Sequence, residues 1–125
     1  MKVVSTNKAP AAIGPYSQAI VTDSLVFTSG QIALNPNGEI VSDDVAAQTK
    51  QVLTNLSEIL AEAGSSLNSV IKTTIYLSSM DDFKIVNEVY ESFFKEHKPA
   101  RSTIAVKTLP LNVKVEIDCI AKVEK

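Results

Sequence analysis

The last segment of the 125-residue chain alternates between apolar and polar side chains. Its apolar positions are Val113, Val115, Ile117, Cys119 and Ala121, and its intervening positions are mostly polar. A period of two residues predicts a β-strand with one face in the core and the other face mostly polar. Such a strand buries its apolar face only beneath a second layer, so we expect a sheet covered on one side.

Two longer segments carry apolar residues at helical spacing and would supply that layer. The first predicted helix spans 43–63, with Ser42 as its cap and Gly64 as its stop. The second spans 81–97 and begins with two aspartates, which interact favourably with the amino end of a helix. Runs rich in β-branched and aromatic residues predict strands at 1–5, 16–22, 25–30, 70–78, 102–106 and 113–123.

The resulting order, βββαβαββ, predicts an α+β fold in a single domain, residues 1–125, with both helices on one face of a mixed sheet and hairpins at both ends. No segment of the chain is left to cover the opposite face. Because the predicted strand 70–78 carries apolar or bulky residues on both of its sides, we expect this face to mediate self-association. Glu116, on the polar side of the last strand, would then lie at a cleft between subunits.

Composition argues against several classes of function. The net charge of −2 and the scattered lysines argue against a nucleic-acid binder. One histidine and one cysteine far apart predict no zinc site, and four separated glycines form neither a Walker loop nor a dinucleotide fingerprint. The single cysteine, with no signal peptide or apolar run of membrane length, indicates a soluble protein in a reducing compartment, which we expect to be the cytoplasm.

Arg101 is the single arginine in a chain with eleven lysines. A planar guanidinium binds a carboxylate or phosphate through two parallel hydrogen bonds, which an ammonium does poorly. Arg101 follows Pro99-Ala100 and begins a predicted strand, so its side chain would be anchored at a rigid edge. An anion-binding role is therefore one interpretation of Arg101, and a surface salt bridge is the other.

Glu116 is the second candidate. It lies on the polar face of a strand that could pair with the strand of Arg101 across the connection 107–112. A catalytic carboxylate and an ordinary solvated one fit the pattern equally well. Tyr16, which follows Gly14-Pro15 and opens a predicted strand, is typical of half-buried packing.

Four further residues have structural as well as functional interpretations. Gly30, after Ser29 at the end of a strand, either makes a turn or exposes its N–H to an anion. Asn87 lies off the apolar stripe of the second helix, which by default places it in solvent. His97 would cap carbonyls or face solvent, and Cys119 would be a small core residue and not a nucleophile.

Several stretches together resemble the Rid proteins, the reactive intermediate deaminases also called the YjgF family. The resemblance extends from residue 9 to the last strand, and its most specific mark is Pro-Ala-Arg-Ser followed by Val-Glu-Ile. The stretches that carry it are "IGPYSQA", "TSGQI", "IKTTIYL", "DDFKIVNEVY" and "PARSTIAVKTLPLNVKVEI".

The resemblance implies a chorismate-mutase-like fold, a homotrimer with three clefts between subunits, and a cofactor-free enzyme. The implied reaction is hydrolysis of 2-imino acids, such as 2-iminobutanoate and 2-iminopropanoate, to 2-keto acids and ammonia. Arg101 would clamp the substrate carboxylate and Glu116 would orient the attacking water. The implied substrate-binding residues are Tyr16, Ser29, Gly30, Asn87 and Thr103.

Thr103 departs from the family pattern, in which many members carry cysteine after Pro-Ala-Arg-Ser. A thiol-based role is therefore not expected at Thr103, which also suits strand packing as a β-branched residue. An alternative function is a non-catalytic or regulatory module that binds small carboxylates in the same clefts. Chorismate-mutase activity is suggested by fold analogy alone.

Overall fold

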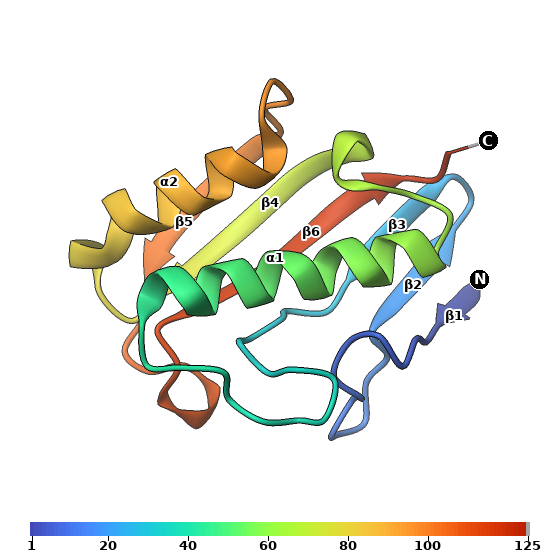
Figure 1. Ribbon diagram of the computed structural model, residues 1–125. Helices are drawn as coiled ribbons and strands as arrows, with labels where there is room; N and C mark the ends of the chain where they lie inside the picture. The colour runs from blue at the N-terminus through green and yellow to red at the C-terminus, as the bar shows by residue number, and fades with distance from the viewer. Residues whose placement is uncertain (125) are drawn as a thin grey trace.

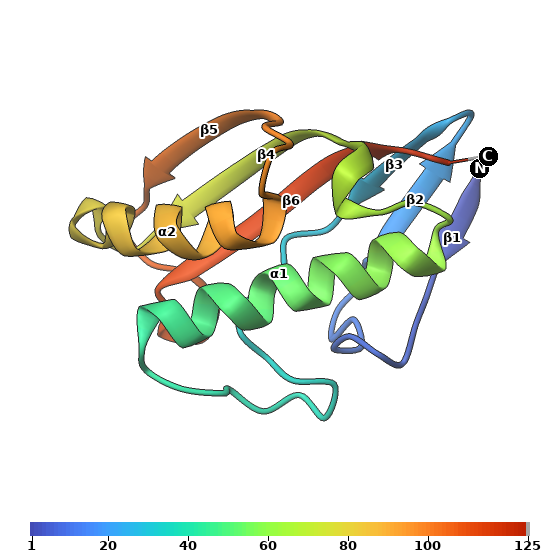
Figure 2. The same cartoon turned by 45° about the horizontal axis from the view of Figure 1, so that its top comes forward.

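The computed structural model describes residues 1–124 and contains six strands and two α-helices in the predicted order. The strands are β1 (Lys2–Val4), β2 (Ala19–Thr22), β3 (Leu25–Thr28), β4 (Val70–Leu77), β5 (Ala100–Ala105) and β6 (Val115–Lys122). The helices are α1 (Val45–Glu62) and α2 (Phe83–Phe94). Both lie side by side on the same face of the sheet, which confirms the α+β architecture (Figures 1 and 2). Among the described residues, no helix is both long and apolar enough to cross a membrane.

Both helices begin later than the sequence predicted. The cap of α1 is Asp44, whose Oδ2 accepts a hydrogen bond from Ala47 N–H at 2.9 Å, while the predicted cap Ser42 accepts from Asp44 N–H. The predicted stop is confirmed, because Gly64 adopts a φ of +80° that favours glycine. Residues 80–82 form a 3₁₀ turn ahead of α2.

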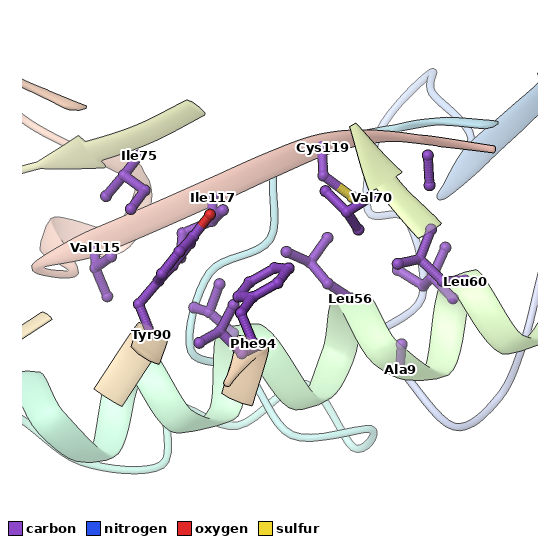
Figure 3. Close-up of a cluster of buried hydrophobic side chains, with 14 of the residues drawn as sticks. Ala9, Leu56, Leu60, Val70, Ile75, Tyr90, Phe94, Val115, Ile117 and Cys119 are labelled. Carbon is purple, nitrogen blue, oxygen red and sulfur yellow. The ribbon is translucent and has the colours of Figure 1, made fainter. Parts of the chain in front are cut away.

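The core lies between the helices and the sheet. The apolar residues of β6 named above are all buried, as the alternation predicted. They pack against a stripe of α1 that includes Leu53, Leu56 and Leu60 and against Tyr90 and Phe94 of α2 (Figure 3). Burial of this apolar surface provides the main free energy that holds the helices on the sheet.

The predicted hairpin at the carboxyl end is wrong. The sheet order is β1-β2-β3-β6-β4-β5, so β6 lies between β3 and β4, and β5 pairs in parallel with β4. The physical reason is burial, because every second residue of β6 is buried, whereas β5 has no buried residue and suits an edge. Arg101 and Glu116 therefore do not lie on paired strands.

The face opposite the helices is uncovered in the single chain (Figure 2). It exposes apolar side chains on β1, β3 and β5, with Val3 at 63%, Phe27 at 41% and Ile104 at 49% exposure, and β6 at its centre carries Glu116 and Asp118. An exposed apolar surface of this kind is typical of interfaces. Self-association through this face stays a prediction.

Candidate functional site

Glu116 lies directly against Gly30. Glu116 is the second residue of β6 and points to the uncovered face of the sheet, and the chain after β3 passes beside it. A Cβ added to Gly30 would overlap the Glu116 carboxylate and would lie 2.9 Å from its Cδ. The φ of Gly30 lies outside the left-handed region, so the backbone conformation does not itself require glycine. Glycine is required here because the Glu116 side chain lies where a Cβ would be.

The backbone around Gly30 presents a free donor. Ser29 N–H donates to Gln18 O and Gln31 N–H donates to Ile117 O, both at 2.9 Å, while the Gly30 N–H between them has no backbone acceptor within residues 1–124. The Ser29 hydroxyl donates to Ser17 O at 2.5 Å. The predicted exposure of the Gly30 N–H to an anion is therefore compatible with the structure, and Ser29 mainly holds the adjoining loop.

These residues line a cleft of about 400 Å³. Its walls come from the loop before β2, the segment after β3 and the loop before β6, and Glu116 is the one charged residue among the described lining residues. The lining consists of Pro10, Ala11, Ile13, Tyr16, Gln18, Ser29, Gly30, Gln31, Ile32, Leu34, Pro110, Leu111 and Glu116. The cleft therefore combines a largely apolar wall with one carboxylate, a composition typical of small-molecule sites.

Tyr16 lies in the loop of this cleft and not in a strand, because β2 begins at Ala19. Its N–H donates to Gly14 O at 2.8 Å, which turns the chain ahead of the strand, and its side chain is about half exposed, as expected for partial packing.

The environment of Glu116 favours its protonated form. Burial raises the pKa of the Glu116 carboxyl, and the negative charge of Asp118, two residues along on the same face, raises it further. Burial also raises the pKa of Asp118, although the hydrogen bond from the Tyr76 hydroxyl and the charge of Lys72 lower it in part. A carboxylate with a raised pKa is a better proton acceptor once it is ionised.

Arg101 lies in a second cleft, of about 770 Å³, between α2 and β5. Asn87 of α2 lines the same cleft. The guanidinium Cζ of Arg101 lies 5.7 Å from the ring centroid of Phe83 and 5.0 Å from that of Tyr90. Both distances are within the range of cation–π attraction. Arg101 thus lies near the start of a strand, as predicted, and this strand is at the edge of the sheet, where aromatic rings of α2 support the guanidinium.

Two polar atoms near Arg101 are buried without a partner among the described residues, namely Asn87 Oδ1 and Thr103 Oγ1. The default prediction that Asn87 faces solvent is wrong for this oxygen, which is buried on the side of α2 that lines the Arg101 cleft. Thr103 shares the helix side of β5 with Arg101 but lines neither cleft. Unpaired buried acceptors of this kind are costly and are often found at functional sites.

The two clefts lie on opposite sides of the sheet. Arg101 pairs in register with the buried Thr73 and faces the helices, whereas Glu116 pairs with Tyr76 and faces away. Their strands are separated by β4. Across β4, the β5 residue level with Glu116 is Ile104, and Arg101 lies three residues before it. These offsets correspond to about 10 Å across the strands and about 10 Å along them. One chain therefore does not bring Arg101 and Glu116 to the same ligand.

The remaining candidates have structural roles. His97 Nε2–H donates to Val70 O at 2.7 Å, so the histidine binds a carbonyl as predicted, but one of β4. Cys119 is buried, and burial raises the pKa of its thiol to about 12. Within residues 1–124, no three histidine, cysteine, aspartate or glutamate side chains are grouped as metal ligands.

Sequence reasoning missed three buried amides that hold the walls of the Glu116 cleft. Gln18 bonds to Thr6 N–H, Thr6 O and Pro10 O, and Asn55 donates to Leu34 O at 2.9 Å. Gln48 accepts from Lys114 N–H at 2.8 Å. Two of these amides could have been found from the sequence, because Gln48 and Asn55 lie within the apolar stripe of the first helix. A polar side chain buried there needs a hydrogen-bond partner.

The family model described as "Endoribonuclease L-PSP" matches residues 6–123. The chain is 56% identical over 121 residues to "Reactive Intermediate Deaminase A, chloroplastic" of Arabidopsis thaliana, covering 96% of this chain and 65% of that protein. It is 50% identical to the mouse "2-iminobutanoate/2-iminopropanoate deaminase", covering 96% of this chain and 90% of the mouse protein. The chain belongs to the L-PSP/YjgF family. The resemblance to Rid proteins is thereby confirmed.

The crystal structure of the YjgF gene product of E. coli has the same fold as this family member. The two chains superpose with a TM-score of 0.94 at 44% identity, covering 99% of this chain and 100% of the other. Thus the arrangement of two helices on a six-stranded mixed sheet agrees with the solved structure of a relative.

Proposed function

We propose that the protein is a deaminase that hydrolyses 2-imino acids such as 2-iminobutanoate and 2-iminopropanoate to 2-keto acids and ammonia. The observation that carries the proposal is the Glu116 carboxylate, held against Gly30 in an otherwise uncharged cleft. The names of the mouse and Arabidopsis relatives support the same activity. Chorismate-mutase activity gains no support from these observations.

The reaction needs a positioned water and a route for protons. Glu116 accepts a proton from water as the water oxygen bonds to the electrophilic imine carbon, which gives a carbinolamine. The carboxyl then returns the proton to nitrogen. As a carboxylate again, it accepts the proton of the carbinolamine hydroxyl while the C=O bond forms, the C–N bond breaks and ammonia leaves, and it passes this proton to the departing ammonia. The atoms balance as imino acid plus water giving keto acid plus ammonia, and the protein supplies position and proton transfer.

The substrate carboxylate requires a cation, which Arg101 supplies in this proposal through two parallel hydrogen bonds. Gly30 N–H is a further donor, and Tyr16 and Ser29 shape the wall of the cleft. Asn87 offers an unpaired oxygen to a donor on the substrate from the Arg101 cleft. Thr103 lies outside both clefts in the single chain, so its unpaired oxygen would reach the substrate beside Arg101 in the assembled site. In this account Thr103 provides an oxygen where many relatives have a thiol.

A complete site requires a second copy of the chain. Arg101 and Asn87 lie in one cleft and Glu116, Gly30, Ser29 and Tyr16 in another, on the other side of the sheet. We therefore propose that the protein is a homotrimer in which one subunit supplies the Arg101 cleft and its neighbour supplies the Glu116 cleft. The uncovered sheet face, with its exposed apolar side chains, supports such association.

RNA cleavage, named in the family description, fits the cleft less well. Its single charged lining residue among those described is a carboxylate, which repels a phosphate backbone, and the chain has a net charge of −2.

The test adds the purified protein to a threonine dehydratase reaction and follows release of 2-ketobutanoate while a competing amine traps the imine. We expect the wild type to raise the rate of 2-ketobutanoate release above that of the dehydratase reaction alone, and Glu116→Gln to give no such increase. Glu62→Gln, which alters an exposed carboxylate at the end of α1, is the matched control and should behave as wild type. If adding the wild-type protein leaves the rate of 2-ketobutanoate release unchanged, while the protein measurably binds the keto acid, the proposal is contradicted and a binding module is indicated.

A further inference from the structure

Arg101 has unusual surroundings for a lone arginine. Its guanidinium lies over the rings of Phe83 and Tyr90, and no carboxylate among residues 1–124 forms an ion pair with it. Aromatic faces attract a cation without using its N–H donors, whereas a neighbouring carboxylate would occupy them. The contacts of Arg101 therefore support the guanidinium and leave its hydrogen bonds free for an anion.

Tyr90 is itself held on several sides. Its hydroxyl lies 2.8 Å from Thr73 Oγ1 in a buried hydrogen bond, and its ring stacks on Phe94 with centroids 4.5 Å apart. Figure 3 shows the Tyr90 ring rising from α2 toward the sheet, with its oxygen at the sheet end. Thr73 is the β4 residue that pairs in register with Arg101. The same strand pair thus positions both the arginine and the hydroxyl that orients the ring.

We propose that Phe83 and Tyr90 form an aromatic shelf that positions Arg101 for binding a carboxylate. An arginine side chain has several rotatable bonds, and ordering it upon binding costs affinity. A shelf that orders the guanidinium in advance removes part of that cost. Phe83 and Tyr90 act through Arg101 and are positioning residues. The choice of a carboxylate as ligand rests on the proposed function, whereas the ordering of Arg101 does not.

Ordering of Arg101 is measured directly because the chain has one arginine. A ¹H–¹⁵N spectrum of the side chain therefore contains one arginine Nε–H signal. We expect this signal to be displaced from the position of free arginine by the ring currents of the shelf, and to return toward that position in Tyr90→Leu and in Phe83→Leu. Phe93→Leu, which removes a ring of α2 outside the shelf, is the matched control and should leave the signal in place.

Binding and turnover supply the second readout. The affinity for 2-ketobutanoate, measured by calorimetry, should fall about 3- to 30-fold in Tyr90→Leu, as expected from loss of a cation–π contact. The same variant should raise KM by a similar factor with little change in kcat. Tyr90→Phe keeps the ring and loses the bond to Thr73, so its effect should be smaller.

An effect that acts through Arg101 must disappear without Arg101. In an Arg101→Gln background, Tyr90→Leu should cause no further loss of keto-acid affinity, whereas a general loosening of the fold would add to the loss. An Nε–H signal that both leucine variants leave unchanged would overturn the proposal. If the signal moves as expected but the wild type releases no keto acid from imines, the shelf stands and the deaminase proposal fails. If Tyr90→Leu does not fold, Phe83→Leu decides, because Phe83 is only partly buried, at the start of α2, whereas Tyr90 is buried.

Discussion

The contact between Gly30 and Glu116 yields the most specific prediction, the effect of Gly30→Ala. The new Cβ would overlap the Glu116 carboxylate and would lie 2.9 Å from its Cδ and 3.1 Å from its Cγ. Ordinary contacts between such carbon atoms begin near 3.5 Å, so the carboxyl group has to move away. Because it is the end of a flexible side chain, Glu116 can do so without disturbing the core.

The expected cost falls on catalysis and not on folding. A misplacement of a catalytic group by about 1 Å reduces the rate about 100-fold. That factor corresponds to a rise of about 2.7 kcal/mol in the activation free energy. The free energy of unfolding should change by less than about 1 kcal/mol, because alanine is compatible with the backbone of Gly30 and reduces the entropy of the unfolded chain.

The assay is keto-acid release from dehydratase-generated imine, run beside thermal unfolding of the same samples. Gly38→Ala is the matched control. Gly38 has a φ of +82° and nothing within 4 Å of an added Cβ, so alanine there strains the backbone without touching the cleft. We expect Gly38→Ala to lose about 1 kcal/mol of stability and to keep full activity, the opposite of Gly30→Ala. Wild-type kcat/KM in a folded Gly30→Ala variant would refute the role assigned to the Glu116 position.

Three further predictions concern charge and the thiol. Arg101→Lys keeps the charge but loses a charge-assisted hydrogen bond, so keto-acid release should fall about 10- to 150-fold with an unchanged Tm; wild-type hydrolysis would refute the carboxylate clamp. Glu116 acts as a base only when it is ionised, and its pKa is raised, so kcat/KM should decline with falling pH already above the ordinary glutamate value of 4.5. Asp118→Asn removes a negative charge that raises this pKa, so it should move the decline to lower pH. An unmoved decline would mean that Asp118 does not act on Glu116. Thiol-alkylating reagents should leave the activity of the native protein intact, because Cys119 is buried and the pKa of its thiol is raised to about 12. Inactivation without loss of fold would contradict the buried position of Cys119.

The architecture could be predicted from the sequence because each element has its own periodicity. The alternation in residues 113–122 and the helical stripes depend on neighbours along the chain, so the order of strands and helices followed directly. Which strands are neighbours depends on the whole sheet. The predicted pairing of the strands of Arg101 and Glu116 failed for this reason, since β4 lies between them.

The candidate site was predictable as a set of residues but not as a geometry. The family motif pointed to Arg101 and Glu116, whereas the contact of Glu116 with Gly30 joins distant parts of the chain and has no local signal. The same holds for the ring of Tyr90, which the helical pattern identified as core, and which also supports Arg101. The separation of the two clefts emerged only from the strand register.

The central claim is that one working site takes residues from two subunits, and subunit mixing tests it most directly. Arg101→Gln and Glu116→Gln are each expected to be inactive, and the two variants are combined by co-expression in equal amounts. If Arg101 and Glu116 act from neighbouring subunits, random trimers regain about one quarter of wild-type activity, because one pairing in four joins an intact Arg101 cleft to an intact Glu116 cleft. Mass measurement confirms that mixed trimers have formed. Mixed trimers with no activity above either variant alone would contradict the shared site.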